Sequence, residues 1–94
     1  MYGIYTGAIL GDATSQFELG KSLIHKNKRI ALFWFEKSAK NGNDDALCAV
    51  ALCSFYGVGT LLNKRKALQL WAEANIRGNK IAHYALKRFF DIGK

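Results

Sequence analysis

An internal repeat constrains the fold of this chain more than any other feature of its sequence. When Arg29 is placed over Arg65, seven of the 22 positions from Arg29 to Val50 are identical, all at one constant offset of 36 residues. Unrelated sequences of this composition would share about one or two. A unit of this length buries its apolar face only against neighbouring copies, so the sequence predicts a repeat array.

The spacing of apolar residues indicates that each unit is a pair of α-helices. Apolar residues recur at helical intervals over residues 30–39 and stop at Asn41-Gly42, and the second copy, residues 67–76, stops before Gly78. The chain contains no proline, and its composition favours helices over β-strands. Five helices are expected, near residues 12–24, 30–41, 44–56, 67–77 and 82–90, with Asp44 or Asp45 capping the third.

Short connections make consecutive helices antiparallel, and stacked pairs bury faces that one pair cannot bury alone. We therefore predict an all-α fold, an α-α superhelix (solenoid) of about two and a half helix-turn-helix repeats with five helices. An N-terminal segment, residues 1–10, would precede a solenoid of residues 11–94, with units at 11–41, 42–77 and, in part, 78–94. Gly57-Val58-Gly59 is expected to be a turn with positive φ, and no phosphate loop, because a helix precedes it.

The second unit combines a leading glycine, small residues in its first helix, a Gly-x-Gly turn and a Lys-Ala-x-x-x-Trp stretch. These positions are Gly42, Ala46, Val50, Ala51, Gly57, Gly59, Lys66, Ala67, Trp71 and Gly78. The first unit matches in part, through Leu19, Gly20, Leu23, Ala31, Trp34 and Ala39, and the third through Gly78, Ala82 and Leu86. On these residues the chain resembles the Sel-one-like repeat family, a relative of the tetratricopeptide repeats, over about residues 11–94.

Small and aromatic residues have a physical role in such a stack. Gly20, Ala51 and Ala85 are expected to let neighbouring helices approach closely. Trp34 and Trp71 are expected to fill the layer between helix pairs.

The resemblance implies a non-enzymatic scaffold, because members of the family generally act as adaptors in bacterial and eukaryotic complexes. A bacterial protein that binds another protein or peptide is therefore expected.

No residues of the sequence are arranged for catalysis, metal binding or a cofactor, and no small-molecule substrate is expected. The sequence contains neither CxxC nor HExxH. We interpret His25 as a solvated surface residue and His83 as a partly exposed structural residue. Cys48 and Cys53 are five residues apart in one predicted helix, which places their side chains beyond disulfide reach. Both are expected to be reduced residues of the core or of a groove.

Charge is distributed unevenly along a chain whose net charge is +7. Residues 1–47 carry six basic and five acidic side chains, whereas residues 48–94 carry eight and two. A basic surface attracts nucleic acid, acidic lipid or an acidic protein, and a merely solvated surface accounts for it equally well. A small basic nucleic-acid-binding helical protein is therefore the alternative to an adaptor, although the repeat core accounts for most aromatic residues.

Neither export nor membrane insertion is expected. The N-terminus has no basic residue before its apolar patch and so is not a signal peptide. The longest apolar run, residues 46–53, is far shorter than the roughly twenty residues that a bilayer span requires. With two unpaired cysteines, this favours a cytoplasmic location.

If the first helix of each pair faces inward, as the resemblance implies, these helices line a groove for a partner. The predicted partner-binding residues are Phe17, Lys21, Ile24, Cys48, Leu52, Phe55, Tyr84 and Arg88. Leu52 and Phe55 are expected to be exposed and to form an anchor pocket. Lys21 and Arg88 at the two ends favour a partner segment that carries carboxylates around a central apolar anchor.

The last predicted helix carries Phe89-Phe90 and has no second helix to cover it. The uncovered end of a solenoid is prone to association. Phe89 and Phe90 are expected either to fold back onto the chain or to pair with downstream sequence or with another subunit, forming a homo-oligomer.

Overall fold

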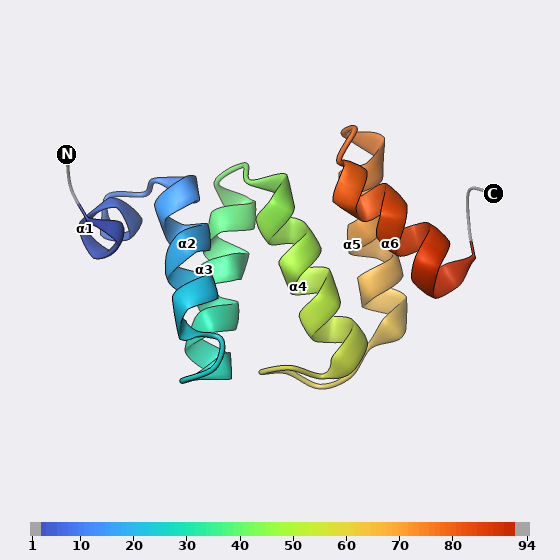
Figure 1. The fold of residues 1–94 in the computed structure, drawn as a ribbon, viewed down its shortest axis with the longest axis horizontal. Helices are drawn as coiled ribbons and strands as arrows, with labels where there is room; N and C mark the ends of the chain where they lie inside the picture. Colours follow the sequence, from blue (N-terminus) through green and yellow to red (C-terminus); the bar gives the residue numbers. More distant parts are fainter. Residues whose placement is uncertain (1–2, 92–94) are drawn as a thin grey trace.

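The computed structural model describes residues 3–91, in which all regular structure is helical (Figure 1). The helices are α1 (Ile4–Ile9), α2 (Ala13–Leu23), α3 (Lys28–Lys40), α4 (Asp44–Tyr56), α5 (Lys64–Ile76) and α6 (Lys80–Phe90). The predicted all-α solenoid is confirmed, but the predicted count of five helices is wrong because α1 was missed. Residues 1–2 of the expected N-terminal segment and 92–94 of the expected third unit lie outside the described residues.

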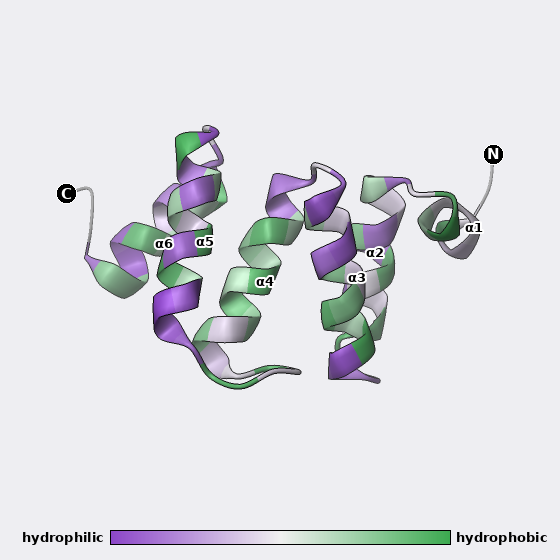
Figure 2. Ribbon diagram, turned by 180° about the vertical axis from the view of Figure 1, so that it is seen from behind, coloured by the Kyte–Doolittle hydropathy of each residue, from purple (hydrophilic) through white to green (hydrophobic). Residues whose placement is uncertain are grey.

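Each helix packs on the next to form an elongated array of 43 × 26 × 16 Å. Helices α2, α4 and α6 lie towards the viewer in Figure 1, and α3 and α5 lie behind them. Helix α4 contacts α3, α5 and α6, and it is correspondingly apolar around most of its circumference (Figure 2). The stack is therefore held together through its central helix.

Three matching links join one helix pair to the next. The glycines at their centres, Gly11, Gly42 and Gly78, have φ values of 92°, 102° and 89°, a conformation that glycine adopts without strain. The residue after each glycine donates its backbone N–H to a carbonyl five residues back, at 2.9–3.0 Å, and its side chain caps the following helix. Asn43 is the cap of α4, so the expectation that Asp44 or Asp45 caps it is wrong.

Helix α1 occupies the position that the end of a pair's second helix occupies in the later repeats. Its link to α2 has the same hydrogen bond and positive-φ glycine as the other two links. The Nε2 of Gln16 donates to the carbonyl oxygen of Ala8 at 3.0 Å, and its Oε1 accepts from Asn41 Nδ2 at 2.9 Å. Gln16 is fully buried, and these bonds satisfy both ends of its amide. One side chain thereby ties α1, α2 and α3 together.

The layer between helix pairs is filled by aromatic residues at equivalent repeat positions. Trp71 is 1% exposed, and its ring stacks on that of Phe89 with the centroids 5.4 Å apart. Phe35, which lies 36 residues before Trp71, is 4% exposed. Trp34 is only half-buried, so the expectation that it fills this layer is wrong and Phe35 does so instead.

Glycines also permit close approach between segments. A Cβ added to Gly20 would lie 2.6 Å from Phe35 Cδ1, which confirms that Gly20 allows α2 to pack closely on α3. Gly57 and Gly59 have φ values of 71° and 73°, as predicted for the turn after α4. A Cβ on Gly59 would lie 2.6 Å from the Lys28 carbonyl oxygen, so this turn rests on the start of α3.

Candidate functional site

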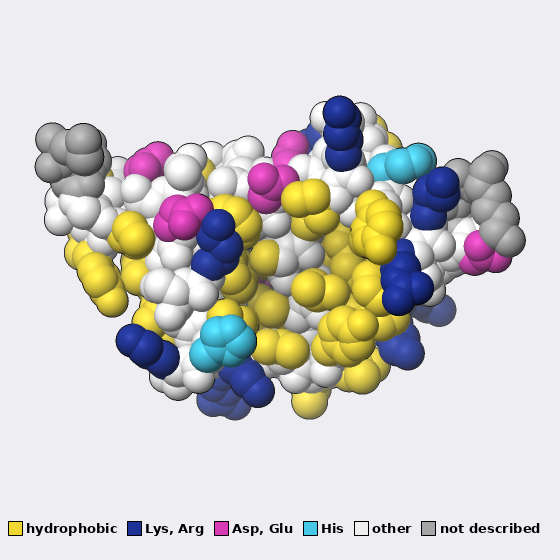
Figure 3. All heavy atoms as spheres, in the orientation of Figure 1, with side chains coloured by type: hydrophobic (Ala, Val, Ile, Leu, Met, Phe, Trp, Pro, Cys, Tyr) yellow, Lys and Arg dark blue, Asp and Glu magenta, His cyan; other side chains and the backbone are white. Residues whose placement is uncertain are grey.

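The face formed by α2, α4 and α6 carries two apolar hollows (Figure 3). The α4–α6 hollow has a volume of about 350 Å³ and is lined by Asp45, Cys48, Ala49, Leu52, Trp71, Ile81, Tyr84, Ala85 and Phe89. The α2–α4 hollow has a volume of about 260 Å³ and is lined by Ile24, Phe35, Ala49, Leu52, Cys53, Tyr56 and Val58. Leu52 and Ala49 line both hollows and so form the ridge between them.

The two hollows are equivalent features of successive repeats. Each lies between two consecutive first helices, and an aromatic residue of the intervening second helix contributes to its lining, Phe35 in one case and Trp71 in the other. Phe35 and Trp71 are not among the predicted partner-binding residues. The offset of 36 residues that relates them was the available signal, because equivalent positions in a stack line equivalent spaces.

Half of the predicted partner-binding residues line these hollows, namely Ile24, Cys48, Leu52 and Tyr84. Phe17 and Lys21 lie outside them on α2. The ring of Phe17 packs against that of Phe35 with the centroids 5.8 Å apart, and the Nζ of Lys21 lies 4.6 Å from the Phe17 centroid. Lys21 also forms an ion pair with Glu18, at 2.8 Å.

The predicted cation at the other end of this face, Arg88, is not paired within the described residues as Lys21 is. Arg88 is exposed on α6 and forms no ion pair with any residue from 3 to 91. The two predicted cations therefore lie at opposite ends of the apolar face, on its outermost helices.

Phe55 does not occupy the predicted position. Its ring lies 4.7 Å from that of Phe89 and 5.8 Å from those of Trp71 and Phe90, measured between centroids. The expectation that Phe55 is exposed is wrong, because the aromatic residues of α5 and α6 close around it and leave it half-buried. The same contacts show that Phe89 and Phe90 fold back onto the chain, one of the two arrangements expected for them.

Comparison with known proteins identifies the family. The model of the Sel1 repeat family matches residues 13–43 and 44–79, more than half of the chain. The chain belongs to the Sel1 repeat family. Sel1 repeat proteins are generally non-enzymatic scaffolds for protein–protein interactions.

Solved structures of Sel1 repeat proteins share the fold. A Sel1 repeat protein from Oxalobacter formigenes is 29% identical and superposes over 90% of this chain with a TM-score of 0.81. The protective antigen c5321 of uropathogenic Escherichia coli, which has the same repeat fold, is 23% identical over 90% of the chain, with a TM-score of 0.80. The chain spans 26% and 20% of the length of these two structures. No curated protein sequence is significantly similar to it.

The described part of this Sel1 repeat chain offers little for other chemistry. Within residues 3–91, no three His, Cys, Asp or Glu side chains lie together in a way that could hold a metal ion. Over the same residues, no helix is both long and apolar enough to cross a bilayer. His25 and His83 are both exposed.

Both cysteines are free and buried, as predicted. The thiol of Cys48 donates to Asn79 Oδ1 at 3.3 Å. Burial raises the pKa of Cys48 to about 12, with further contributions from the carboxylates of Asp45 and Asp44. Burial likewise raises the pKa of Cys53. Neither thiol is an activated nucleophile in the folded chain.

The raised pKa of Cys48 predicts a pH dependence of stability. The unfolded chain releases this proton near pH 9, whereas the folded chain keeps it until about pH 12. The contribution of the protonated Cys48 thiol to the free energy of unfolding is therefore complete below pH 9 and is lost as the pH rises towards 12. Urea unfolding should show wild type losing stability relative to Cys48→Ala above pH 9. A difference between the two proteins that stays constant with pH would contradict this.

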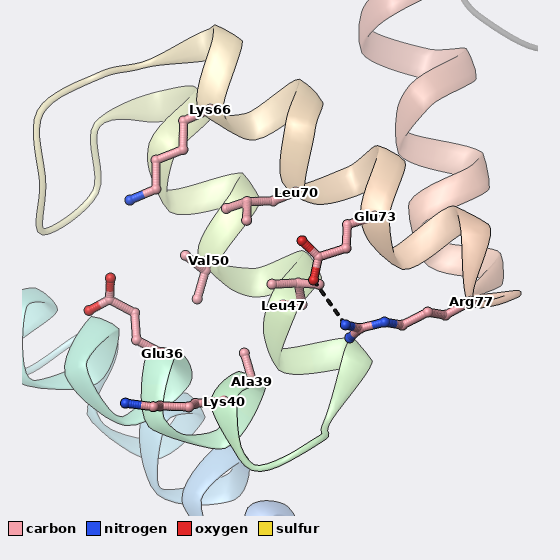
Figure 4. A pocket seen from close by; sticks show the side chains of 9 residues that line it. All are labelled: Glu36, Ala39, Lys40, Leu47, Val50, Lys66, Leu70, Glu73 and Arg77. Carbon is pink, nitrogen blue, oxygen red and sulfur yellow. Dashed lines mark ion pairs between the residues drawn. The ribbon is translucent and has the colours of Figure 1, made fainter.

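A further groove lies on the opposite side of the molecule, between α3 and α5 and over α4 (Figure 4). It has a volume of about 400 Å³ and is lined by Glu36, Ala39, Lys40, Leu47, Val50, Lys66, Leu70, Glu73 and Arg77. Arg77 lies 2.9 Å from Asp44 and 3.0 Å from Glu73, and the Asp44 carboxylate raises the pKa of Arg77. This outer groove was not foreseen, because it exists only where two second helices diverge over α4.

Proposed function

We propose that this Sel1 repeat chain binds a partner protein through the face of α2, α4 and α6, and that it catalyses no reaction. The observation that carries the proposal is the pair of adjacent apolar hollows that share Leu52. Two apolar side chains of the partner fill the hollows, one on each side of the Leu52 ridge. This arrangement gives binding energy from buried apolar area and selects the spacing of the partner's anchors.

The exposure of the lining residues supports this assignment. Leu52 is 43% exposed, Ile81 54% and Tyr84 63%, although each lies beside well-packed core residues. Large apolar side chains gathered on one face of a small domain are typical of an interaction surface. Figure 3 shows them across the middle of this face, with cationic side chains towards both ends.

The charges at the ends of the face indicate the chemistry of the partner. Lys21 and Arg88 complement a segment that carries carboxylates outside its apolar anchors. Arg88 contributes the greater share, because Glu18 already neutralises much of the charge of Lys21.

The outer groove is the weaker candidate for this role. Its floor is apolar, but Arg77 on its wall is engaged by Asp44 and Glu73 within the chain. A partner would have to compete with these ion pairs. The hollows beside Leu52 have almost entirely apolar linings and present no such competition.

We also propose a bacterial, cytoplasmic adaptor. The similarity to the Oxalobacter formigenes protein supports the bacterial origin, and the two unpaired cysteines support a reducing compartment. A homo-oligomer through α6 is less well supported, because Phe89 and Phe90 already pack on Phe55 and Trp71.

The proposal is tested by comparing wild type with Leu52→Asp. Partners are captured from nuclease-treated lysate, identified, purified and titrated against both proteins. A carboxylate on the ridge is expected to weaken binding at least about tenfold, because it must be desolvated between two apolar anchors. Ile30→Asp is the matched control: Ile30 is 47% exposed on α3 and lines neither hollow, so binding should be unchanged.

The charge arm of the experiment uses the double variant Lys21→Glu, Arg88→Glu. Its affinity for the same partner should fall at low salt and approach that of wild type at high salt. Equal affinity of wild type and Leu52→Asp would exclude this face. A partner captured from untreated lysate but absent from nuclease-treated lysate would instead support the nucleic-acid-binding alternative.

A further inference from the structure

Six cations lie in the turns that join the two helices of each pair or in the first turn of the helix that follows. We name this set the basic edge: Lys26, Lys28, Arg29, Lys64, Arg65 and Lys66. All six side chains are exposed, and within residues 3–91 none forms an ion pair. The contact of Gly59 with the Lys28 carbonyl brings the turn after α4 against the start of α3, and both turns lie along the lower side of Figure 1.

Neither turn contains an acidic residue, and Glu36, in the middle of α3, shares the lining of the outer groove with Lys66 (Figure 4). The sequence has no Asp or Glu from residue 19 to 35 or from residue 46 to 72, the two stretches that contain these turns. Asp12, Asp44 and Asp45 belong to the glycine links at the opposite edge, and on the face drawn in Figure 3 the acidic side chains lie above the lower edge. The net positive charge of the chain is therefore concentrated on one side of the solenoid.

At these positions the cations do not stabilise the helix ends, although the Nζ of Lys64 lies 4.9 Å from the centroid of the Phe55 ring. Lys28 and Arg29 lie in the first turn of α3, and residues 64–66 form the first turn of α5. The N-terminal end of a helix has a partial positive charge, so cations there are unfavourable and anions are favourable. An external anionic surface would relieve the repulsion at both helix ends at once.

Two leucines project from the same edge. Leu61 is 88% exposed and Leu62 is 59% exposed, and both lie in the turn directly before Lys64. Apolar side chains gain nothing from the phosphate backbone of a nucleic acid, which is bound by cations and stacked aromatic residues. They do gain from entering the boundary between lipid headgroups and acyl chains. The combination therefore favours lipid over nucleic acid.

We propose that the basic edge docks on an anionic membrane surface. Leu61 and Leu62 enter the headgroup–acyl boundary, and the six cations lie against anionic lipid headgroups. The face formed by α2, α4 and α6 is a different side of the molecule from the basic edge, so it remains open to a partner protein. The inference is independent of the function proposed above, since it uses none of the residues that line the hollows.

Co-sedimentation of the full chain with phosphatidylcholine vesicles, with and without phosphatidylserine, tests the proposal. Binding is expected only with phosphatidylserine and should weaken as salt is raised. The triple variant Lys64→Gln, Arg65→Gln, Lys66→Gln should bind about a hundredfold more weakly, or about fivefold per cation. The matched triple variant Lys40→Gln, Lys80→Gln, Lys87→Gln removes the same charge elsewhere and should bind almost as wild type does.

The leucines are tested separately from the charges. Leu61→Ser should weaken vesicle binding about tenfold. Ile76→Ser is its control, because Ile76 is 86% exposed at the other end of α5 and should leave binding unchanged. All of these side chains are exposed, and circular dichroism verifies that each variant is folded.

Three results would overturn the proposal. The first is equal binding to neutral vesicles, and the second is an equal loss in the two triple variants. The third is tight binding of a single-stranded RNA probe that needs residues 64–66 and is insensitive to Leu61→Ser, without vesicle binding. That last result would assign the basic edge to nucleic acid.

Discussion

Replacing Trp71 with alanine is expected to lower the free energy of unfolding by about 3–5 kcal/mol. Trp71 is 1% exposed, and its ring contacts those of Phe55, Phe89 and Phe90. Removing it leaves a cavity at the point where α4, α5 and α6 meet. A domain of this size has only about 5–15 kcal/mol of stability, so much of it should be lost. Urea unfolding followed by far-ultraviolet circular dichroism measures the change without a tryptophan signal.

Trp34→Ala is the matched control, because it deletes the same side chain from a half-buried position on α3. The loss there should be about 1 kcal/mol, the centre of the range for point mutations in general, because Trp34 is only half-buried. Equal losses in the two variants would mean that the layer between helix pairs does not depend on Trp71 as the structure indicates.

Gly59→Ala is expected to cost about 3 kcal/mol, from two separate sources. The φ of 73° at Gly59 is unfavourable for a residue with a Cβ atom. The new Cβ would also lie 2.6 Å from the carbonyl oxygen of Lys28, which is backbone and so cannot move aside cheaply. Thermal or urea unfolding measures the combined cost.

Gly42→Ala separates the cost of the positive φ from the cost of the steric contact. Gly42 has a φ of 102°, but a Cβ there would meet nothing within 4 Å. Only the conformational cost of about 1–2 kcal/mol should remain. If Gly59→Ala were no more destabilising than Gly42→Ala, the turn after α4 would not rest on α3 in the way described.

The parts of the fold that the sequence predicted are those set by local rules. Apolar periodicity located α2 to α6, and glycines mark the ends of α3, α4 and α5. Helix α1 was missed because it has six residues and no side-chain cap. It is held in place by Gln16, a contact from the next helix that no local pattern reveals.

Side-chain placement was harder to predict than the helices themselves. Phe33, Trp34 and Phe35 are consecutive, and neighbouring residues on a helix point about 100° apart, so which aromatic residue enters the core depends on how α3 is rotated. Phe55 raised the same difficulty, since its burial depends on Phe89 and Phe90 arriving from α6. The hollows beside Leu52 required the relative positions of three helices, which the repeat pattern alone does not fix.

The glycine links determine how a solenoid of this kind can gain or lose repeat units. Gly11, Gly42 and Gly78 each face open space, and the backbone hydrogen bonds around them are made within five residues of the link. A duplicated stretch from Asn43 to Gly78, placed after Gly78, would therefore begin and end at junctions of the same shape. Modular growth by one whole unit preserves every junction, whereas insertion of part of a unit would misplace the helix that follows.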